Sequence, residues 1–499
     1  MQSTATVVVF GFYLLALAGI AYYGWLRTHN ISDYVLGGRS LSPFAAAMSS
    51  GASNMSAWLM LSVPALVYFS STEAFLIAGG LLLGQYVSIL VVAPRLRVYS
   101  ERLNDSQTLP IFFANRTGRT GRDGALLRGI CSLILLVFML LYVASGLVAG
   151  GELFMNMFDV SLSTAVIMGA LVIGAYTLIG GFLAISWTDV LQALMMLMIL
   201  IVLPLIILST SAPDPQQQAG SVDFPPLLDT SVGWILVISS LAWGLGYIGL
   251  PHSVMRYKAI RSVKGIPFFR RTLISWSILV FIGSLSLGLA ARAWYVPAEG
   301  ASGEDLTLQM LGQFFNPWVA GLALAAIMAA VMSTADSQLL LASVSISEDL
   351  IAPLRPDWDS DRRLWIGRIT VLLIMGFSLS LALQGGNTIL SLVSYAWAGL
   401  GAAFGPVMLF ALYWRKFNYI GAIAGVSVGG VSTILLQNFP PIEGLYELLP
   451  AFALSALAIW LCGRFAPQDQ AAEEVFDRLE AEPLWAESPA ADTQTTLKN

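Results

Sequence analysis

The sequence predicts an all-α protein that crosses a membrane many times. Of its 499 residues, 57% are hydrophobic and only 11% are charged, and the core of one soluble chain cannot hide that much apolar surface. Apolar runs of about 20 residues, the length that spans a bilayer as a helix, recur almost from end to end. A membrane β-barrel is excluded, because its strands would alternate in short segments.

Thirteen of these runs are predicted to be transmembrane helices. They cover residues 5–25, 43–69, 74–93, 126–150, 161–182, 186–210, 232–252, 273–295, 315–345, 365–384, 389–414, 419–437 and 444–463. The first run is expected to be a span and not a secretory signal, because no Lys or Arg precedes it and it is longer than a signal core. Residues 1–464 therefore form the predicted membrane domain. The Ala-, Glu- and Pro-rich residues 465–499 are predicted to be a mostly disordered cytoplasmic tail with one short helix.

The basic residues predict the orientation, because cytoplasmic segments accumulate Lys and Arg. With the N-terminus outside, Arg292 is the only Lys or Arg in an external segment, and the external loop 211–231 has none. We therefore expect a multi-pass protein of a bacterial inner membrane with a cytoplasmic C-terminus. The net charge of −5 sums two faces of different character and indicates no nucleic-acid partner.

Two spans are predicted to be broken in mid-membrane. The second contains a run of small and hydroxylated residues, 49–58, and the seventh contains three glycines and Pro251 within 242–252. Unpaired backbone groups are tolerated at this depth only where they face a cavity, an ion or a substrate. Because the breaks are five spans apart, we expect an inverted repeat of five helices plus five, over residues 43–210 and 232–414. The alternative for each segment is close helix packing through small residues.

A carboxylate, Asp336, lies in the ninth span, where a charge is costly and usually functional. Helix geometry places Ser333, Asp336 and Ser337 on one face, and their oxygens suit a hard cation. The alternative is that the hydroxyls bond to their own helix and that Asp336 pairs with a basic residue. Asp189, near the start of the sixth span, is expected to be either a helix N-cap or part of a cation site.

Seven separated segments make the chain resemble the sodium:solute symporter family, and within it the bacterial members that carry proline. They are residues 33–41, 49–58, 180–189, 243–252, 315–318, 332–334 and 392–399, and the resemblance covers nearly the whole chain except the tail. It implies the amino-acid-transporter (LeuT-like) fold with broken helices and alternating access. It also implies sodium-coupled uptake of L-proline, a small zwitterion, and no enzyme activity.

The resemblance further implies two sets of binding residues. One co-transported sodium ion is expected on the carbonyls of Ala52, Met55 and Ala330 and the hydroxyls of Ser333 and Thr334. The solute is expected beside Trp243, Tyr247 and Pro251, with Tyr142 and Trp58 as neighbours. Aromatic walls suit an apolar ring, and helix N-terminal amides or a cation suit a carboxylate.

The chain departs from the family pattern near the sodium site. Asn54 stands where the proline-carrying members have aspartate, and Ala57 stands where they have glycine. Asparagine keeps a carbonyl oxygen but lacks the negative charge that attracts a cation. We therefore expect Asp336 to compensate part of the sodium charge, or to form a second cation or coupling site with Asn54, Asp189 and Ser337.

Several functional alternatives remain open from the sequence. The solute is proline or another small zwitterion or amino acid, and the coupling ion is sodium or a proton carried by Asp336. A transporter-like sensor without transport is a further alternative, although the tail is too short for a kinase domain. A channel is disfavoured because the polar residues cluster at the breaks. An enzyme is disfavoured because His29 and His252 are the only histidines and no nucleophile–base motif accompanies them.

Overall fold

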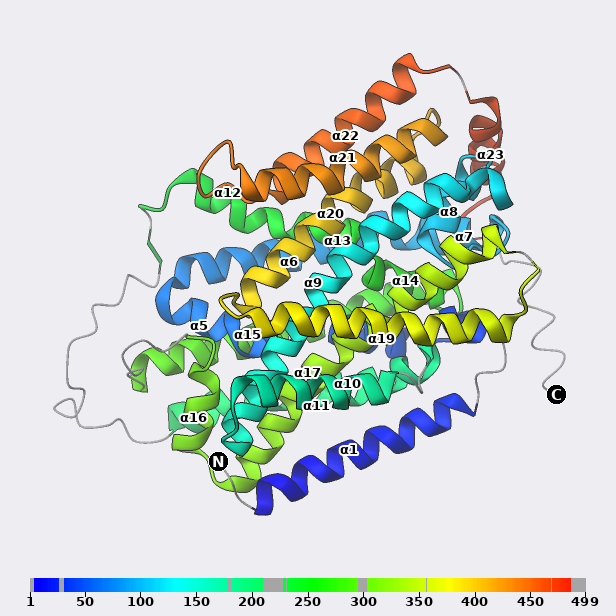
Figure 1. Ribbon diagram of the computed structural model, residues 1–499. Coiled ribbons are helices and arrows are strands. Elements are labelled where there is room, and N and C mark those ends of the chain that lie inside the picture. Colours follow the sequence, from blue (N-terminus) through cyan, green and yellow to red (C-terminus); the bar gives the residue numbers. More distant parts are fainter. Residues whose placement is uncertain are drawn as a thin grey trace.

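The computed structural model describes residues 4–26, 31–177, 181–209, 228–229, 231–294, 303–355, 357–467 and 469–485. Within these ranges every regular element is a helix, and a single bridge joins Leu41 to Ile260. The long helices run side by side in one bundle (Figure 1), which confirms the all-α, multi-span prediction. Most of the predicted external loop 211–231 and the end of the tail, 486–499, lie outside the described residues.

Among the described residues, ten helices are long and apolar enough to cross a membrane without a sharp break. They are α1 (Thr4–Trp25), α6 (Ser71–Val91), α9 (Ala125–Phe158), α11 (Phe182–Ser209), α15 (Ile266–Trp294), α17 (Pro317–Val344), α19 (Ser360–Gln384), α20 (Ile389–Tyr413), α21 (Tyr419–Asn438) and α22 (Leu448–Phe465). Two bent spans raise the number to twelve. The remaining predicted span, the fifth (161–182), corresponds to α10 (Leu162–Thr177), which packs on α9 and α19 but has only 16 residues.

Both predicted breaks are confirmed. The second span consists of α3 (Pro43–Asn54), α4 (Ala57–Met60) and α5 (Ser62–Phe69) and bends by 72°. The seventh consists of α12 (Trp234–Ala242), η3 (Trp243–Leu245), α13 (Gly246–Gly249) and α14 (Pro251–Ala259) and bends by 45°. Pro251 forces the second break, because it has no N–H and holds Leu250 in an extended conformation.

Close packing also explains the glycines of the seventh span. A Cβ on Gly246 would lie 2.0 Å from Nε1 of Trp397, and a Cβ on Gly249 would lie 2.4 Å from the backbone nitrogen of Gly405. Both contacts are shorter than any side chain tolerates, so α13 reaches α20 only because these positions lack a side chain. The seventh span is therefore both broken and closely packed, so the two alternatives offered for its glycines both apply.

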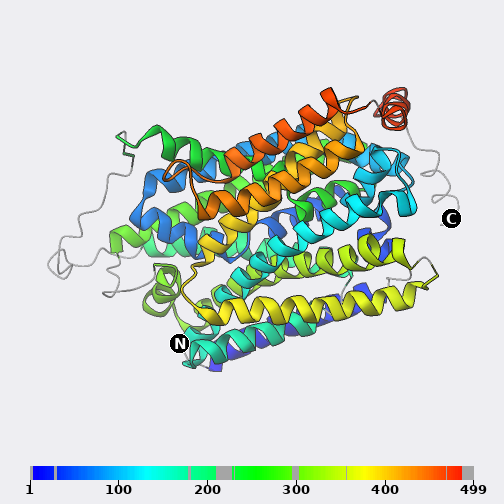
Figure 2. The ribbon, with the colours of Figure 1, turned by 45° about the horizontal axis from the view of Figure 1, so that its top comes forward.

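Short helices cover the ends of the bundle. They are α2 (Ile31–Leu36), η1 (Gly37–Arg39), α7 (Ala93–Arg102), α8 (Leu109–Arg116), η2 (Gly121–Gly124), η4 (Val263–Gly265), α16 (Leu306–Phe314), η5 (Ser345–Ile351), α18 (Ala352–Leu354) and α23 (Gln470–Glu480). Helices α7, α8 and α23 gather at one end of the molecule, opposite the start of α12 (Figures 1 and 2).

Arginine side chains, one buried and one exposed, bind the tail helix α23 to this end. Arg116 is fully buried and donates to the carbonyls of Ala411, Trp414 and Ala472 at 2.8–3.1 Å. Burial lowers the pKa of Arg116 to about 10, so the guanidinium stays charged at neutral pH. Arg415 pairs with Asp477 at 2.8 Å, which adds an ionic contact on the outer side of α23.

Replacing Arg116 with alanine is expected to release α23. A hydrogen bond to a charged group contributes about 1.5–3 kcal/mol, so losing the bond to Ala472 alone should raise amide exchange in residues 470–480 at least about tenfold. Hydrogen exchange measured by mass spectrometry tests this. Arg119→Ala is the matched control, because that guanidinium only lies over the ring of Tyr419, 5.8 Å from its centroid. Equal exchange in both variants would contradict the role of Arg116.

Candidate functional site

Oxygen atoms from α3 and α17 converge at the first break. The Ser333 hydroxyl donates to the carbonyl of Ala52 at 3.0 Å and to that of Ala330 at 3.1 Å, and the Thr334 hydroxyl lies 3.4 Å from the Ala52 carbonyl. Met55 directly follows the last residue of α3, where helix carbonyls lose their intrahelical partners. Ser333 thus bonds both to its own helix and across to α3. The structure brings together four of the five predicted sodium-binding residues by measured contacts and places Met55 at the same break.

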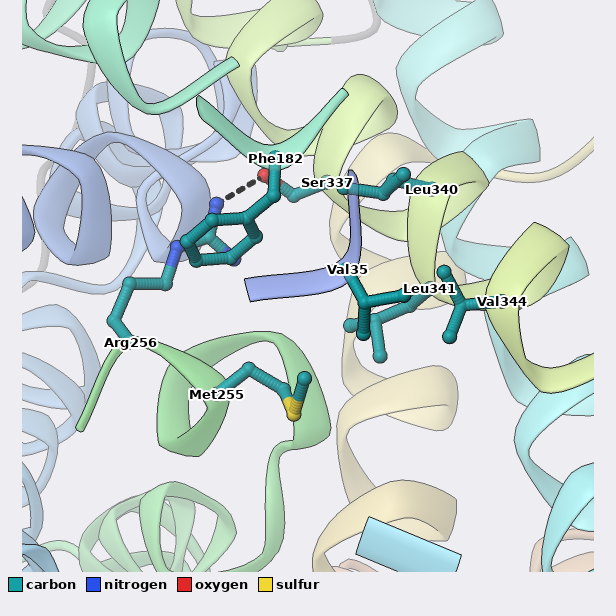
Figure 3. A pocket seen from close by; sticks show the side chains of 8 residues that line it. All are labelled: Val35, Phe182, Met255, Arg256, Ser337, Leu340, Leu341 and Val344. Carbon is teal, nitrogen blue, oxygen red and sulfur yellow. Dashed lines mark hydrogen bonds between the residues drawn. The ribbon is translucent and has the colours of Figure 1, made fainter. Parts of the chain in front are cut away.

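A guanidinium occupies the region where the sequence suggested a second cation. Arg256 of α14 is buried, lies 3.3 Å from the Asp189 carboxylate and donates to the Ser337 hydroxyl at 2.6 Å. Figure 3 shows the hydrogen bond from Arg256 to Ser337, with the ring of Phe182 beside the guanidinium. The Asp189 carboxylate also accepts from the Ser49 hydroxyl at 2.6 Å. Asp189 and Ser337 therefore contact a resident side-chain cation.

The structure does not bring Asp336 to that group. Its carboxylate accepts a hydrogen bond from Thr177 of α10, and its second oxygen has no partner among the described residues. The prediction that Ser333, Asp336 and Ser337 share one face is wrong in detail. Positions i+3 and i+4 lie about 100° apart around a helix, so Asp336 turns to α10 while Ser337 turns to α14. The four residues proposed for a second cation site are thus divided among different contacts.

The N-cap interpretation of Asp189 is also wrong. Helix α11 begins at Phe182, which leaves Asp189 about two turns inside the helix, where the first-turn amides are out of reach. Its carboxylate is fully buried and needs a partner at this depth. Arg256 provides that partner from another span.

Asn54 ends α3 and links the two broken spans. Its amide nitrogen donates to the Ser253 hydroxyl of α14 at 3.2 Å and lies 3.4 Å from that of Ser50. Its side-chain oxygen, Oδ1, has no partner among the described residues. Asn54 therefore keeps an oxygen available at the break while its nitrogen holds α3 to α14.

Aromatic rings surround the second break. Trp58 of α4 and Trp243 lie with ring centroids 6.4 Å apart, and Tyr142 of α9 lies edge-on to His252 at 5.8 Å. Pro251 is the first residue of α14. The Tyr247 hydroxyl and both ring nitrogens of His252 are buried without a partner among the described residues. Polar groups at this depth are as a rule hydrogen-bonded, so these atoms suit a polar ligand.

Two aromatic residues that the sequence did not assign complete this cluster. Trp397 of α20 donates from Nε1 to the Trp243 carbonyl at 2.9 Å, and its ring lies 5.1 Å from that of Tyr247. Tyr446 stacks on Trp243 with centroids 5.2 Å apart. Trp397 falls within the segment 392–399 that carries the family resemblance, which was a signal for its importance. Tyr446 had no such signal, because it lies in the connection between α21 and α22.

Cavities lie on both sides of the aromatic cluster. The outer cavity, of about 420 Å³, extends to Trp243 from the end opposite α23 and is lined also by Tyr446, Ser239 and Ser394. The cavity in Figure 3 lies beside Arg256 on the other side, between Val35, Phe182 and Val344, and measures only about 10 Å³. That volume holds about one water molecule. The cavity beside Arg256 is therefore too small for an amino acid.

The family model described as "Sodium:solute symporter family" matches residues 34–429, which is well over half of the chain. The chain belongs to the sodium:solute symporter family. The symporter is 42% identical over 475 residues to the sodium/proline symporter of Haemophilus influenzae, covering 91% of this chain and 92% of that protein. It is 41% identical to the high-affinity proline transporter PutP of Bacillus subtilis, covering 88% and 94%.

Solved structures confirm the fold of the symporter. A substrate-bound, outward-open Na⁺-coupled sialic acid symporter matches with a TM-score of 0.74 at 19% identity, covering 93% of this chain and 99% of that one. The transporter MhsT in complex with L-phenylalanine matches with a TM-score of 0.52 at 13% identity, covering 87% and 99%. The symporter therefore has the amino-acid-transporter fold predicted from its broken spans.

Family membership also settles the general class of activity. The symporter is a multi-pass protein of the bacterial inner membrane and a transporter, not an enzyme. Sodium is its co-transported ion.

Proposed function

We propose that this symporter takes up L-proline together with sodium by alternating access, with its N-terminus outside and its C-terminus in the cytoplasm. The observation that carries the proposal is the first break, which separates a set of converging oxygens at Ala52, Ser333 and Thr334 from an aromatic wall at Trp58. A sodium ion and a zwitterionic solute with an apolar ring, bound on either side of one short break, would each favour the same closed arrangement. Because sodium and solute favour the same arrangement, each raises the affinity of the protein for the other. The curated relatives at 37–42% identity are named for proline transport.

The proposed sodium site consists of the carbonyls of Ala52, Met55 and Ala330 and the hydroxyls of Ser333 and Thr334. All are neutral oxygens, which hard cations accept. The O···O separations of 3.0–3.4 Å among Ala52, Ala330, Ser333 and Thr334 support this site. Each sodium ion that moves inward releases about 2.3 kcal/mol of free energy per 100 mV of membrane potential. This free energy drives the uptake of a zwitterion.

The proposed solute site lies between Trp58, Trp243 and Tyr247, beside Pro251 and Tyr142. The aromatic rings supply apolar walls for a pyrrolidine ring. The N-terminus of α14 is a positive dipole end, which suits the proline carboxylate. The Tyr247 hydroxyl, which has no partner among the described residues, is a donor for that carboxylate.

The proposed repeats and orientation follow from the arrangement of the spans. The bent spans each open a set of five, over residues 43–210 and 232–414. Arg95, Arg102, Arg116 and Arg415 all contact α23 or the segment after it. Clustering of basic side chains at this end supports a cytoplasmic location. Helices α1, α21 and α22 lie outside the two sets.

Equilibrium binding of radiolabelled proline to the purified symporter tests the proposed solute. In sodium we expect saturable binding that potassium does not support at the same pH and ionic strength. Other amino acids and betaine, added as competitors, test selectivity for proline. A proline affinity that depends on pH and does not depend on sodium would indicate proton coupling instead. Absence of proline binding, with strong binding of another zwitterion, would contradict the proposed solute.

We also propose that Asp336 compensates part of the charge of bound sodium without contacting it. Asp336 lies two residues from Thr334 and has no basic partner among the described residues, so its field is weakly opposed in a medium of low dielectric constant. Asp336→Asn should therefore raise the sodium concentration for half-maximal proline binding about tenfold. Thr177→Val, which removes only the partner hydroxyl, should change it far less. An unchanged sodium dependence in Asp336→Asn would contradict this role.

A further inference from the structure

The connection between α21 and α22 places an aromatic ring on Trp243. The rings of Tyr446 and Trp243 are stacked, with centroids 5.2 Å apart and an angle of 21° between their planes. Helices α21 and α22 lie outside both proposed sets of five spans. A connection outside the two proposed sets of five spans thus contacts Trp243, which lies between the outer cavity and the proposed solute site.

Tyr446 is held in this position by hydrogen bonds to two spans. Its hydroxyl donates to the Ser394 carbonyl of α20 at 2.7 Å, and its backbone N–H donates to the Ser239 hydroxyl of α12 at 3.0 Å. The Ser239 hydroxyl in turn donates to the Gly444 carbonyl at 3.0 Å. The ring is therefore fixed in position relative to both helices that flank Trp243.

The stacked pair stands where a solute would have to pass. Trp243 and Tyr446 both line the outer cavity of about 420 Å³, and Trp243 is only 6% exposed. Tyr247, one turn further along the same span, is fully buried. A solute that moves from the outer cavity to Tyr247 has to displace Trp243, and the stack with Tyr446 opposes that displacement.

We propose that Tyr446 is a positioning residue for the outer side of the solute site, acting by holding the Trp243 ring over bound solute. The inference rests on the proposed proline site and adds a residue to it. Stabilising the covered arrangement slows the return of solute to the outside and therefore raises its affinity. Removing the stack lowers proline affinity more than it lowers the maximal rate, because the sodium site and the α23 side of the cluster are untouched.

Two substitutions separate the ring from its hydroxyl. Tyr446→Leu removes the stack, and we expect the KM for proline to rise about tenfold with a maximal rate within about threefold of the parent. Tyr446→Phe keeps the ring and loses only the bond to Ser394, so its KM should stay within about threefold. Phe158→Leu is the matched control, because it removes another stacked pair, with Phe154 at 5.7 Å, and should leave KM unchanged.

The rate at which a thiol in the outer cavity is modified provides a second measurement. Ser240→Cys places a thiol in the lining of the outer cavity at a position only 2% exposed. A membrane-impermeant thiol reagent should modify it several-fold faster in Tyr446→Leu than in Tyr446→Phe. In the parent background, sodium with proline should slow the modification.

The outcomes are distinct. An unchanged proline KM in Tyr446→Leu, or equal thiol modification in the Leu and Phe variants, would overturn the inference. If Tyr446→Leu does not reach the membrane, the parent carrying Ser240→Cys decides, and modification that ignores sodium and proline would overturn it. A parent protein that does not bind proline at all would instead contradict the proposed function.

Discussion

Replacing Ser333 with alanine is expected to weaken sodium binding by roughly 10- to 100-fold. The Ser333 hydroxyl is the oxygen that contacts both Ala52 and Ala330, so its loss removes a ligand and leaves the α3 carbonyl facing an apolar methyl group. An interaction with a full charge contributes about 1.5–3 kcal/mol, which corresponds to that range of affinity. The measurement is the sodium concentration that gives half-maximal proline binding.

Ser378→Ala is the matched control for this prediction. The Ser378 hydroxyl also donates across helices, from α19 to the Leu140 carbonyl of α9 at 2.8 Å, and is equally buried. Its loss should reduce stability without changing sodium affinity. If both variants shift the sodium dependence to the same extent, the oxygens at the first break do not form the sodium site.

Replacing Arg256 with glutamine is expected to destabilise the symporter by about 3–5 kcal/mol and to abolish most of its uptake. Arg256 and Asp189 are both buried, and removing one partner of a buried ion pair leaves an uncompensated charge. Thermal unfolding in detergent and proline uptake measure the two effects. Combining Arg256→Gln with Asp189→Asn removes both charges, and the double variant should be more stable than Arg256→Gln alone.

An exposed pair provides the control. Arg415 and Asp477 form a 2.8 Å ion pair in which both side chains are about half exposed, and such pairs contribute roughly 0–1 kcal/mol. Arg415→Gln should therefore leave uptake and unfolding nearly unchanged. A double variant no more stable than Arg256→Gln would show that burial of the Asp189 charge is not the cause of the loss.

The spans and both breaks were predictable because their causes are local in the sequence. An apolar run of about 20 residues indicates a membrane span directly. Pro251 determines the second break because it has no N–H and restricts the conformation of the residue before it. The seventh span illustrates the limit. Arg256 follows the break and was counted among cytoplasmic residues, but α14 carries it back into the core beside Asp189. Its position in the sequence did not indicate how deeply it is buried in the bundle.

The failures at Asp189 and Asp336 have the same physical origin. Each carboxylate has partners on other spans, Arg256 for one and Thr177 for the other, and no spacing along the chain reports which helices pack together. The family resemblance did identify the oxygens around Ser333. It did not identify Tyr446, because a tyrosine in a connection has no periodicity and gains its role only when α22 packs beside α12.

Proline uptake into proteoliposomes tests the central claim most directly. An inward sodium gradient is compared with an inward potassium gradient at the same pH and membrane potential, with radiolabelled proline outside. Sodium-coupled symport predicts saturable accumulation above the equilibrium level with sodium and none with potassium. Accumulation that is equal under both gradients, or that requires only a pH gradient, would contradict it.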